Sequence, residues 1–178
     1  ASDVYKRQDP YFVFVSEYML QQTTVNTVKN KFNDFILKWP SLNKLAQTSE
    51  PNILKFWSGL GYYSRARNLL KSAKIIKKNF KNNIPQTYDE LIQLPGIGDY
   101  TAKAILGIGY NKSVMPLDAN IERILVRLHA IDKPINKVKN KLKDLGKKFI
   151  SDKYSSNLIQ SFMDYGSEIC LPRNPKCN

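Results

Sequence analysis

Residues 94–106 read LPGIGDYTAKAIL and predict a tight turn that leads directly into a helix. Gly96 and Gly98 allow backbone angles with positive φ, which a sharp reversal needs, and the following helix presents free N–H groups at its first turn. Such a helix start is a phosphate-binding site. A plain connection between two helices, with glycine caps, has the same spacing. The rest of the chain must therefore decide between a phosphate site and a structural turn.

Apolar residues recur at helical spacing along almost the whole chain, and strand-like alternation is hard to find. The sequence therefore predicts an all-α fold. A plausible seam between two lobes is the segment from Asn111 to Leu117, because Pro116 blocks the continuation of a helix there. Caps and helix breakers place the helices at residues 11–22, 24–38, 41–48, 51–57, 63–80, 87–93, 99–109, 119–130, 135–150 and 155–169.

The chain has 178 residues, of which 42% are hydrophobic and 24% charged, as in ordinary globular proteins. Its 28 Lys and Arg against 15 Asp and Glu give a formal net charge of +13, which attracts polyanions such as nucleic acid. A compositional bias of the source explains this charge equally well. No stretch reaches the ~18 consecutive apolar residues of a membrane helix, and residues 1–8 lack a secretory h-region, so we expect an intracellular protein.

A basic, aromatic segment, GLGYYSRAR at residues 59–67, precedes the turn. Tyr62 and Tyr63, on a turn flanked by glycines, can stack on bases or wedge between them, and Arg65 and Arg67 can contact phosphates. These are the properties of a surface that distorts DNA. The lysines that follow fit a solvated face of an amphipathic helix equally well.

Glu17 lies in the run YFVFVSEYML, residues 11–20, which is apolar on nearly every face of the predicted helix. Loss of solvation should raise the pKa of its carboxyl group, so that it holds a proton near neutral pH and serves as a general acid. Gln21 falls one helical turn further on, with Gln22 and Thr23 beside it, and adds hydrogen-bonding groups. The alternative is a first-turn glutamate that the helix dipole stabilises.

Asp118 directly precedes the predicted helix 119–130, which predicts an N-cap whose carboxylate accepts hydrogen bonds from backbone N–H groups. Those bonds should keep the carboxylate ionised, with a low pKa. Cleavage of a glycosidic bond needs a protonated acid for the leaving group and a carboxylate for the oxocarbenium-like sugar. Glu17 and Asp118 are the candidates, although the sequence does not show that they face each other.

Cys170 and Cys177 are the two cysteines of the chain and are separated by six residues. Two thiolates supply only half of a four-cysteine metal site, and unliganded cysteines fit the spacing at least as well. His129 lies in an apolar helix and is predicted to be structural. The sequence contains no zinc, nucleotide or Ser-His-Asp motif.

Four segments together resemble the helix-hairpin-helix DNA glycosylase superfamily and, within it, the adenine-removing MutY family: residues 16–23, 59–67, 94–102 and 117–120. The similarity extends from Pro10 to Cys177, with the motifs in the family's order. It implies a base excision repair enzyme that hydrolyses the N-glycosidic bond of adenine mispaired with 8-oxoguanine or guanine in double-stranded DNA. It also implies a two-lobed fold with the DNA in the groove between the lobes.

By this resemblance, Glu17 matches the acid that protonates adenine, Asp118 the aspartate that supports the sugar cation, and Asn120 the asparagine beside it. Asp164 lies where the family places an acidic residue near the adenine pocket. The residues that we expect to contact DNA are Gln21, Gln22, Thr23, Tyr62, Tyr63, Arg65, Arg67, Gly96, Gly98 and Thr101.

Tyr100 is counted with the catalytic residues because of the position it occupies. The endonuclease III-like branch has a lysine there, which forms a Schiff base with the sugar and gives lyase activity. Tyrosine cannot form one, so the resemblance implies a monofunctional hydrolase. Two rivals remain: a bifunctional endonuclease III-like enzyme for oxidised pyrimidines, and a non-catalytic helix-hairpin-helix module that only binds DNA.

Family members hold a 4Fe-4S cluster with four cysteines, and Cys170 and Cys177 match the first two ligands. We therefore expect a chain truncated within the cluster motif, without the C-terminal domain that recognises 8-oxoguanine. The expected organisation is a non-native or disordered start at 1–8, a six-helix barrel lobe with the hairpin at 9–110 and a C-terminal helical lobe at 111–178. We expect a monomer in the cytoplasm of a bacterium, or in the nucleus or mitochondrion of a eukaryote.

Overall fold

The computed structural model describes residues 9–150 and 153–177, and over these residues it contains helices and connecting turns but no strand. The all-α prediction is therefore confirmed. The prediction for residues 1–8 lies outside the described residues. The helices are α2 (Pro10–Leu20), α3 (Val25–Lys38), α4 (Leu42–Ala46), α5 (Glu50–Trp57), α6 (Ser64–Asn79), α7 (Tyr88–Ile92), α8 (Asp99–Ala104), η1 (Ile105–Gly109), α9 (Ala119–Leu128), α10 (Ile135–Lys147) and α11 (Ser155–Glu168).

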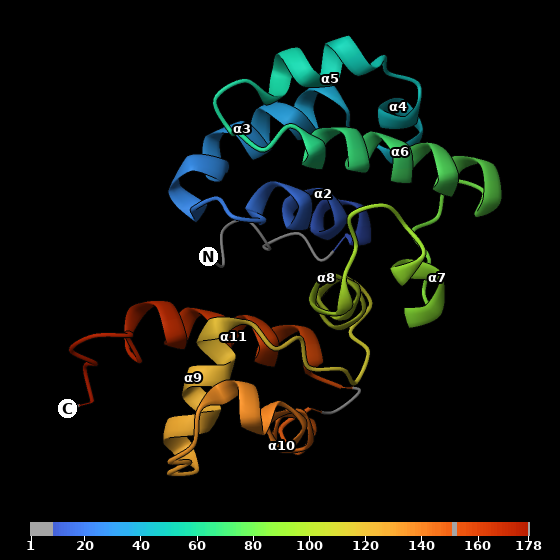
Figure 1. The fold of residues 1–178 in the computed structure, drawn as a ribbon. Coiled ribbons are helices and arrows are strands. Elements are labelled where there is room, and N and C mark those ends of the chain that lie inside the picture. The colour runs from blue at the N-terminus through green and yellow to red at the C-terminus, as the bar shows by residue number, and fades with distance from the viewer. Residues whose placement is uncertain (1–8, 151–152, 178) are drawn as a thin grey trace.

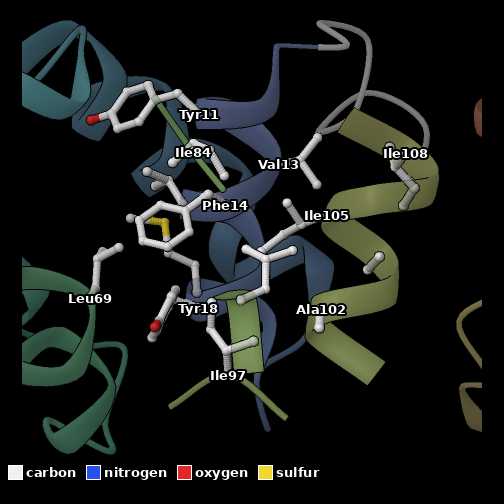
Figure 2. Close-up of a cluster of buried hydrophobic side chains, with 14 of the residues drawn as sticks. Tyr11, Val13, Phe14, Tyr18, Leu69, Ile84, Ile97, Ala102, Ile105 and Ile108 are labelled. Atoms are coloured by element: carbon white, nitrogen blue, oxygen red, sulfur yellow. The ribbon is translucent and has the colours of Figure 1, made fainter. Parts of the chain in front are cut away.

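Helix α2 is buried along most of its length. It begins at Pro10, and Asp9 caps it by accepting a hydrogen bond of 2.8 Å from the backbone N–H of Tyr11. A helix that is apolar all round is stable only when other elements surround it. Figure 2 shows side chains of α2 packed with Leu69 of α6 and with Ile105 of η1. The helix ends at Leu20, two residues before its predicted end, and Gln22 then has a φ of 56°.

Helix α8 continues into the π-helical turn η1, where the sequence predicted one regular helix over residues 99–109. A Cβ atom at Gly107 would lie 2.4 Å from Cδ1 of Ile159 on α11 and 2.9 Å from the backbone carbonyl oxygen of Val114, so a side chain here would force these neighbours to shift. Helix α2 packs on η1 as well. The segment α8–η1 thus joins the early helices to the late ones and fixes their relative position.

The described helices lie in two groups (Figure 1). Helices α2 to α8 form one group, and α9, α10 and α11 form the other, with the segment 111–118 running between them. Within the second group, α9 packs against both α10 and α11. None of the described helices is long and apolar enough to cross a membrane.

Candidate active site

A cavity of about 330 Å³ lies where the C-terminal end of α2 meets the first turns of α8 and α9 and the second half of α11. Its lining contains residues that the sequence singled out, namely Glu17, Gln21, Thr23, Tyr100, Asp118 and Asn120, and others that it did not, namely Leu20, Val25, Met163 and Ser167. A larger cavity of about 430 Å³ lies between α8 and α10, but Asp144, the acid in its lining, is exposed. The smaller cavity is the candidate active site, because a buried acid lines it.

Glu17 is that buried acid, with an exposed fraction of 2%. The run of apolar residues around it predicted this burial. Glu17 lies near the C-terminal end of α2, where the helix dipole disfavours negative charge, so it is not a first-turn glutamate stabilised by the dipole. The cavity is the opening through which a ligand can reach its carboxyl group.

Tyr100, in the first turn of α8, lines the same cavity as Glu17 and Asp118. Burial raises the pKa of the Tyr100 phenol well above its ordinary value, and the carboxyl groups of Glu17 and Asp118, when ionised, raise it further. Glu17, Tyr100 and Asp118 all line this one cavity, so the structure brings together the two carboxyl groups that the sequence could not place relative to each other. The phenol stays protonated at neutral pH, so it can donate a hydrogen bond into the cavity.

Asp118 caps α9 as predicted, because its Oδ1 accepts a hydrogen bond of 2.7 Å from the backbone N–H of Ile121. The prediction of a low pKa is wrong. Burial raises the pKa of Asp118, and this effect exceeds the opposing hydrogen bonds from Ile121 and Asn120 and the positive charge of Arg123. A cap on an exposed helix end would have kept the pKa of the carboxyl group low, but this end faces the cavity between the two groups of helices.

Asn120 is held from two sides. Arg123 donates a hydrogen bond of 2.8 Å to its Oδ1 and another of 2.6 Å to the carbonyl oxygen of Gly166 on α11. A Cβ atom at Gly166 would lie 2.6 Å from Cβ of Asn120, so α11 passes too close for any other residue. Sequence reasoning missed Arg123, although it lies one helical turn after Asn120 and that spacing could have identified it.

Of the three residues that follow α2, two line the cavity and one is exposed outside it. Gln21 and Thr23 line the cavity, and Nε2 of Gln21 also donates a hydrogen bond of 3.0 Å to the carbonyl oxygen of Gly96. Gln22 lies between them, exposed, in the left-handed region of backbone space. Non-glycine residues at positive φ are strained and often functional, which leaves Gln22 a candidate for contact outside the cavity.

The turn before α8 differs from its prediction at two positions. Gly96 has a φ of 82°, as a sharp reversal requires, but Gly98 has a φ of −104° and is the extended N-cap of α8, so the expected positive φ at Gly98 is wrong. Thr101 is 4% exposed, so its predicted contact with DNA would not be made by its side chain. Only its backbone N–H, in the first turn of α8, is left for that role.

The segment 59–67 contains both exposed and buried side chains. Tyr62 and Tyr63 are exposed, and Tyr62 has a φ of 45°. Arg67 is about half exposed and pairs with Glu50 at 2.9 Å. The prediction that Arg65 contacts phosphates is wrong, because its guanidinium is buried and donates hydrogen bonds to backbone carbonyl groups.

Asp164 lies on α11 between Met163 and Ser167, which line the cavity, while Asp164 itself is half-buried and outside the lining. Its predicted role near an adenine pocket remains a prediction.

The two cysteines lie beyond α11, with Cys170 buried and Cys177 exposed. Nη1 of Arg127 donates a hydrogen bond of 3.2 Å to Sγ of Cys170, which holds this sulfur in place beside α9. Within residues 9–150 and 153–177, no group of three or more His, Cys, Asp or Glu could hold a metal ion. The described residues thus fit half of a four-cysteine site.

Comparison with known proteins places this geometry in a family. Residues 15–148 match the HhH-GPD superfamily, described as a base excision DNA repair protein. The chain is 44% identical over 173 residues to an adenine DNA glycosylase of Buchnera aphidicola subsp. Baizongia pistaciae, covering 97% of the chain and 49% of the relative. It is 37% identical over 171 residues to the adenine DNA glycosylase of Homo sapiens, covering 94% and 31%. The chain therefore spans half or less of the length of these relatives.

Solved structures agree on the fold. A thermostable thymine-DNA glycosylase has a TM-score of 0.87 at 24% identity, covering 98% of this chain and 82% of that one. Endonuclease III in a non-covalent DNA complex has a TM-score of 0.79 at 21% identity, covering 96% and 79%. The expected glycosylase fold is confirmed, and the chain belongs to the HhH-GPD superfamily of base excision DNA repair proteins.

Proposed function

We propose that the chain is the catalytic part of an adenine DNA glycosylase, which hydrolyses the N-glycosidic bond of adenine mispaired with 8-oxoguanine or guanine in duplex DNA. The names of its bacterial and mammalian relatives support this activity. The observation that carries the proposal is the shared cavity, in which the buried Glu17 and the capping Asp118 both act on Tyr100.

The target base must leave the duplex, because its glycosidic bond is out of reach within the stack. The exposed Tyr62 and Tyr63 can stack on the bases that remain, and the turn at Gly96 can bind the backbone nearby. The extruded base then enters the cavity between the apolar side chains of Leu20 and Met163. We propose that helices α2 to η1, residues 9–110, and helices α9 to α11 act as two lobes on either side of this DNA.

Glu17 donates its proton to a ring nitrogen of the adenine, and the bond between that base and the sugar breaks. Asp118, when ionised, stabilises the positive charge on the sugar, and water then adds to the sugar carbon and releases a proton. Asn120 keeps the carboxylate in place through hydrogen bonds that lower its pKa. General acid catalysis of this kind typically contributes ~10²–10⁴-fold.

Tyr100 makes the proposed enzyme monofunctional. A lyase needs an amine at the sugar to form a Schiff base, and Tyr100 offers a phenol whose raised pKa keeps it protonated. Its hydroxyl group can donate a hydrogen bond but cannot hold the sugar covalently. The rival enzyme for oxidised pyrimidines therefore lacks its nucleophile at this position.

The family likeness also implies a 4Fe-4S cluster, an electron-carrying iron site, for which Cys170 and Cys177 would supply two of the four ligands. No step of the proposed hydrolysis is assigned to it. We further propose that the protein acts as a monomer on duplex DNA, in the cytoplasm if it is bacterial.

Single-turnover base release tests the proposal. The substrate is a duplex with adenine opposite 8-oxoguanine, and Glu17→Gln is the comparison. We expect adenine release without strand cleavage from the parent protein, and a rate at least ~10²-fold lower from Glu17→Gln with DNA binding retained. Turnover retained by Glu17→Gln contradicts the assignment of the acid. A covalent DNA adduct trapped by borohydride supports the lyase, and binding without base release supports the non-catalytic module.

A further inference from the structure

Arg65 is the second residue of α6, shortly after the turn at residues 59–63, and is 5% exposed. Its guanidinium bridges two segments that are far apart in the chain. One nitrogen, Nη1, donates to the carbonyl oxygens at the C-terminal end of α2, and the other, Nη2, donates to the turn before α6. The acceptors are Tyr18, Met19 (2.7 Å) and Gln21 for Nη1, and Leu60 (2.8 Å) and Gly61 (3.2 Å) for Nη2.

These bonds explain why a buried cation is tolerated here. The last carbonyl groups of a helix have no partner within the helix, and together they form the negative end of its dipole. Arg65 lies at that end of α2. Among the residues that the structure describes, no carboxylate forms an ion pair with Arg65, so carbonyl dipoles compensate its charge. A planar guanidinium serves several acceptors at fixed angles, which the single ammonium of lysine cannot do.

Both bridged segments carry residues of the proposed site. On one side, Glu17 directly precedes the carbonyl groups that Arg65 binds, and Gln21 lines the cavity. On the other side, Tyr62 follows Gly61, is 62% exposed and lies with its ring 5.6 Å from the guanidinium carbon. Trp57 also lies 5.6 Å from that carbon, and its indole N–H donates a hydrogen bond of 3.2 Å to Gly61.

We propose that Arg65 is a positioning residue, which couples the exposed turn at Tyr62 to the turn of α2 that carries Glu17. The inference rests on the proposed function, in which Tyr62 contacts DNA and Glu17 protonates the extruded base. Arg65 touches neither DNA nor base. It holds the two segments at a fixed separation, so that a base displaced at Tyr62 meets the acid in the correct geometry.

Arg65→Lys tests the coupling, because it keeps the charge and loses the fork of donors. We expect its single-turnover rate at saturating enzyme to fall about 10- to 100-fold, the loss that a misplacement of roughly 1 Å causes, with the dissociation constant for the duplex changed less than about threefold. Tyr11→Phe is the control for stability alone, because it removes a buried hydrogen bond of 2.7 Å to Trp39 at the other end of α2. It should lower the melting temperature and leave the rate unchanged.

A double variant separates coupling from general damage. If Arg65 acts through Tyr62, Tyr62→Ala combined with Arg65→Lys should be no slower than the slower single variant. The proposal is overturned if the double variant loses rate by the product of the two single losses. An unchanged rate in folded Arg65→Lys also overturns it. If Arg65→Lys does not fold, Trp57→Phe tests the same connection, because it keeps a buried ring and loses the bond to Gly61. A lowered rate supports the coupling, and an unchanged rate overturns it.

Failure of the proposed function would look different, because the parent protein would then release no adenine. Fluorescence still tests the coupling in that case. The chain has two tryptophans, so Trp39→Phe leaves Trp57 as the single reporter beside Arg65. We expect its emission to change when a duplex with adenine opposite 8-oxoguanine binds, and this change to be lost in Tyr62→Ala and in Arg65→Lys. A change that persists in Arg65→Lys overturns the proposal.

Discussion

The side-chain amide of Gln21 donates a hydrogen bond of 3.0 Å to the carbonyl oxygen of Gly96. The hydroxyl groups of Tyr18 and Ser72 both donate to the neighbouring carbonyl oxygen of Pro95. The turn that is expected to bind phosphate is thus attached to the end of α2, the helix that carries Glu17. A DNA backbone held at this turn has a fixed position relative to the acid.

Gly96 and Gly98 should respond differently to alanine. At Gly96 the φ of 82° and the contacts of 3.0 Å from a Cβ atom to Tyr18 and Asn68 oppose a side chain, so Gly96→Ala should lose about 1–3 kcal/mol of unfolding free energy. Gly98→Ala meets no atom within 4 Å and should stay within about 0.5 kcal/mol. Urea unfolding measures both. Equal losses would contradict the assigned backbone roles.

Asp118→Asn should separate stability from activity. The asparagine side chain can still cap the N–H of Ile121, but it removes a charge that burial disfavours. Because the pKa of Asp118 is raised in the folded state, ionisation at neutral pH costs stability, and the variant should melt at the same or a higher temperature. The rate of adenine release should fall by about 10²–10³-fold. A melting temperature clearly below that of the parent would contradict the raised pKa.

The dependence of the rate on pH reports the same carboxylate. Below its pKa, Asp118 is neutral and cannot stabilise a sugar cation, so the rate should fall with acid at a pH above 3.8, the ordinary pKa of aspartic acid. Asn120 lowers the pKa of Asp118 through hydrogen bonds, so Asn120→Ala should move this midpoint to higher pH. Asn83→Ala, at an exposed position outside the cavity, is the control. A midpoint unchanged by Asn120→Ala would refute the assignment.

Tyr62→Gly should weaken DNA binding without loss of stability. Glycine relieves the strain of a φ of 45°, while the loss of an exposed aromatic ring removes stacking worth ~1–3 kcal/mol, or about 5- to 150-fold in the dissociation constant. Tyr154→Gly is the matched control, because Tyr154 is also exposed but has a φ of −136°. It should lose up to ~1 kcal/mol of stability and bind DNA as the parent does. Identical dissociation constants for DNA in the two variants would show that Tyr62 does not contact the DNA.

Gly166→Ala, a substitution on α11, should disturb the candidate active site through Asn120. Its Cβ atom would lie 2.6 Å from Cβ of Asn120, so either the helix or Asn120 must move. We expect a loss of about 1–3 kcal/mol of unfolding free energy and a slower rate, since Asn120 supports Asp118. Thermal unfolding and single-turnover release measure the two effects. A variant with unchanged stability and rate would show that α11 can withdraw without affecting the cavity.

The sequence by itself determined the helices, the cap at Asp118 and the burial of Glu17. Each predicted helix has a counterpart in the structure, and the apolar run around Glu17 predicted its burial. These features depend on neighbours within one or two helical turns, which the sequence shows directly. The family motifs added the order and the proposed roles of the site residues.

Only the tertiary structure decided which basic and polar side chains face solvent. Arg65 and Arg67 are two residues apart on one helix, yet the first is buried against carbonyl groups of α2 and the second is half exposed. The raised pKa of Asp118 likewise depends on helices that are distant in the sequence. Exposure and desolvation are set by what packs across a side chain from elsewhere in the chain, and periodicity within one helix does not contain that information.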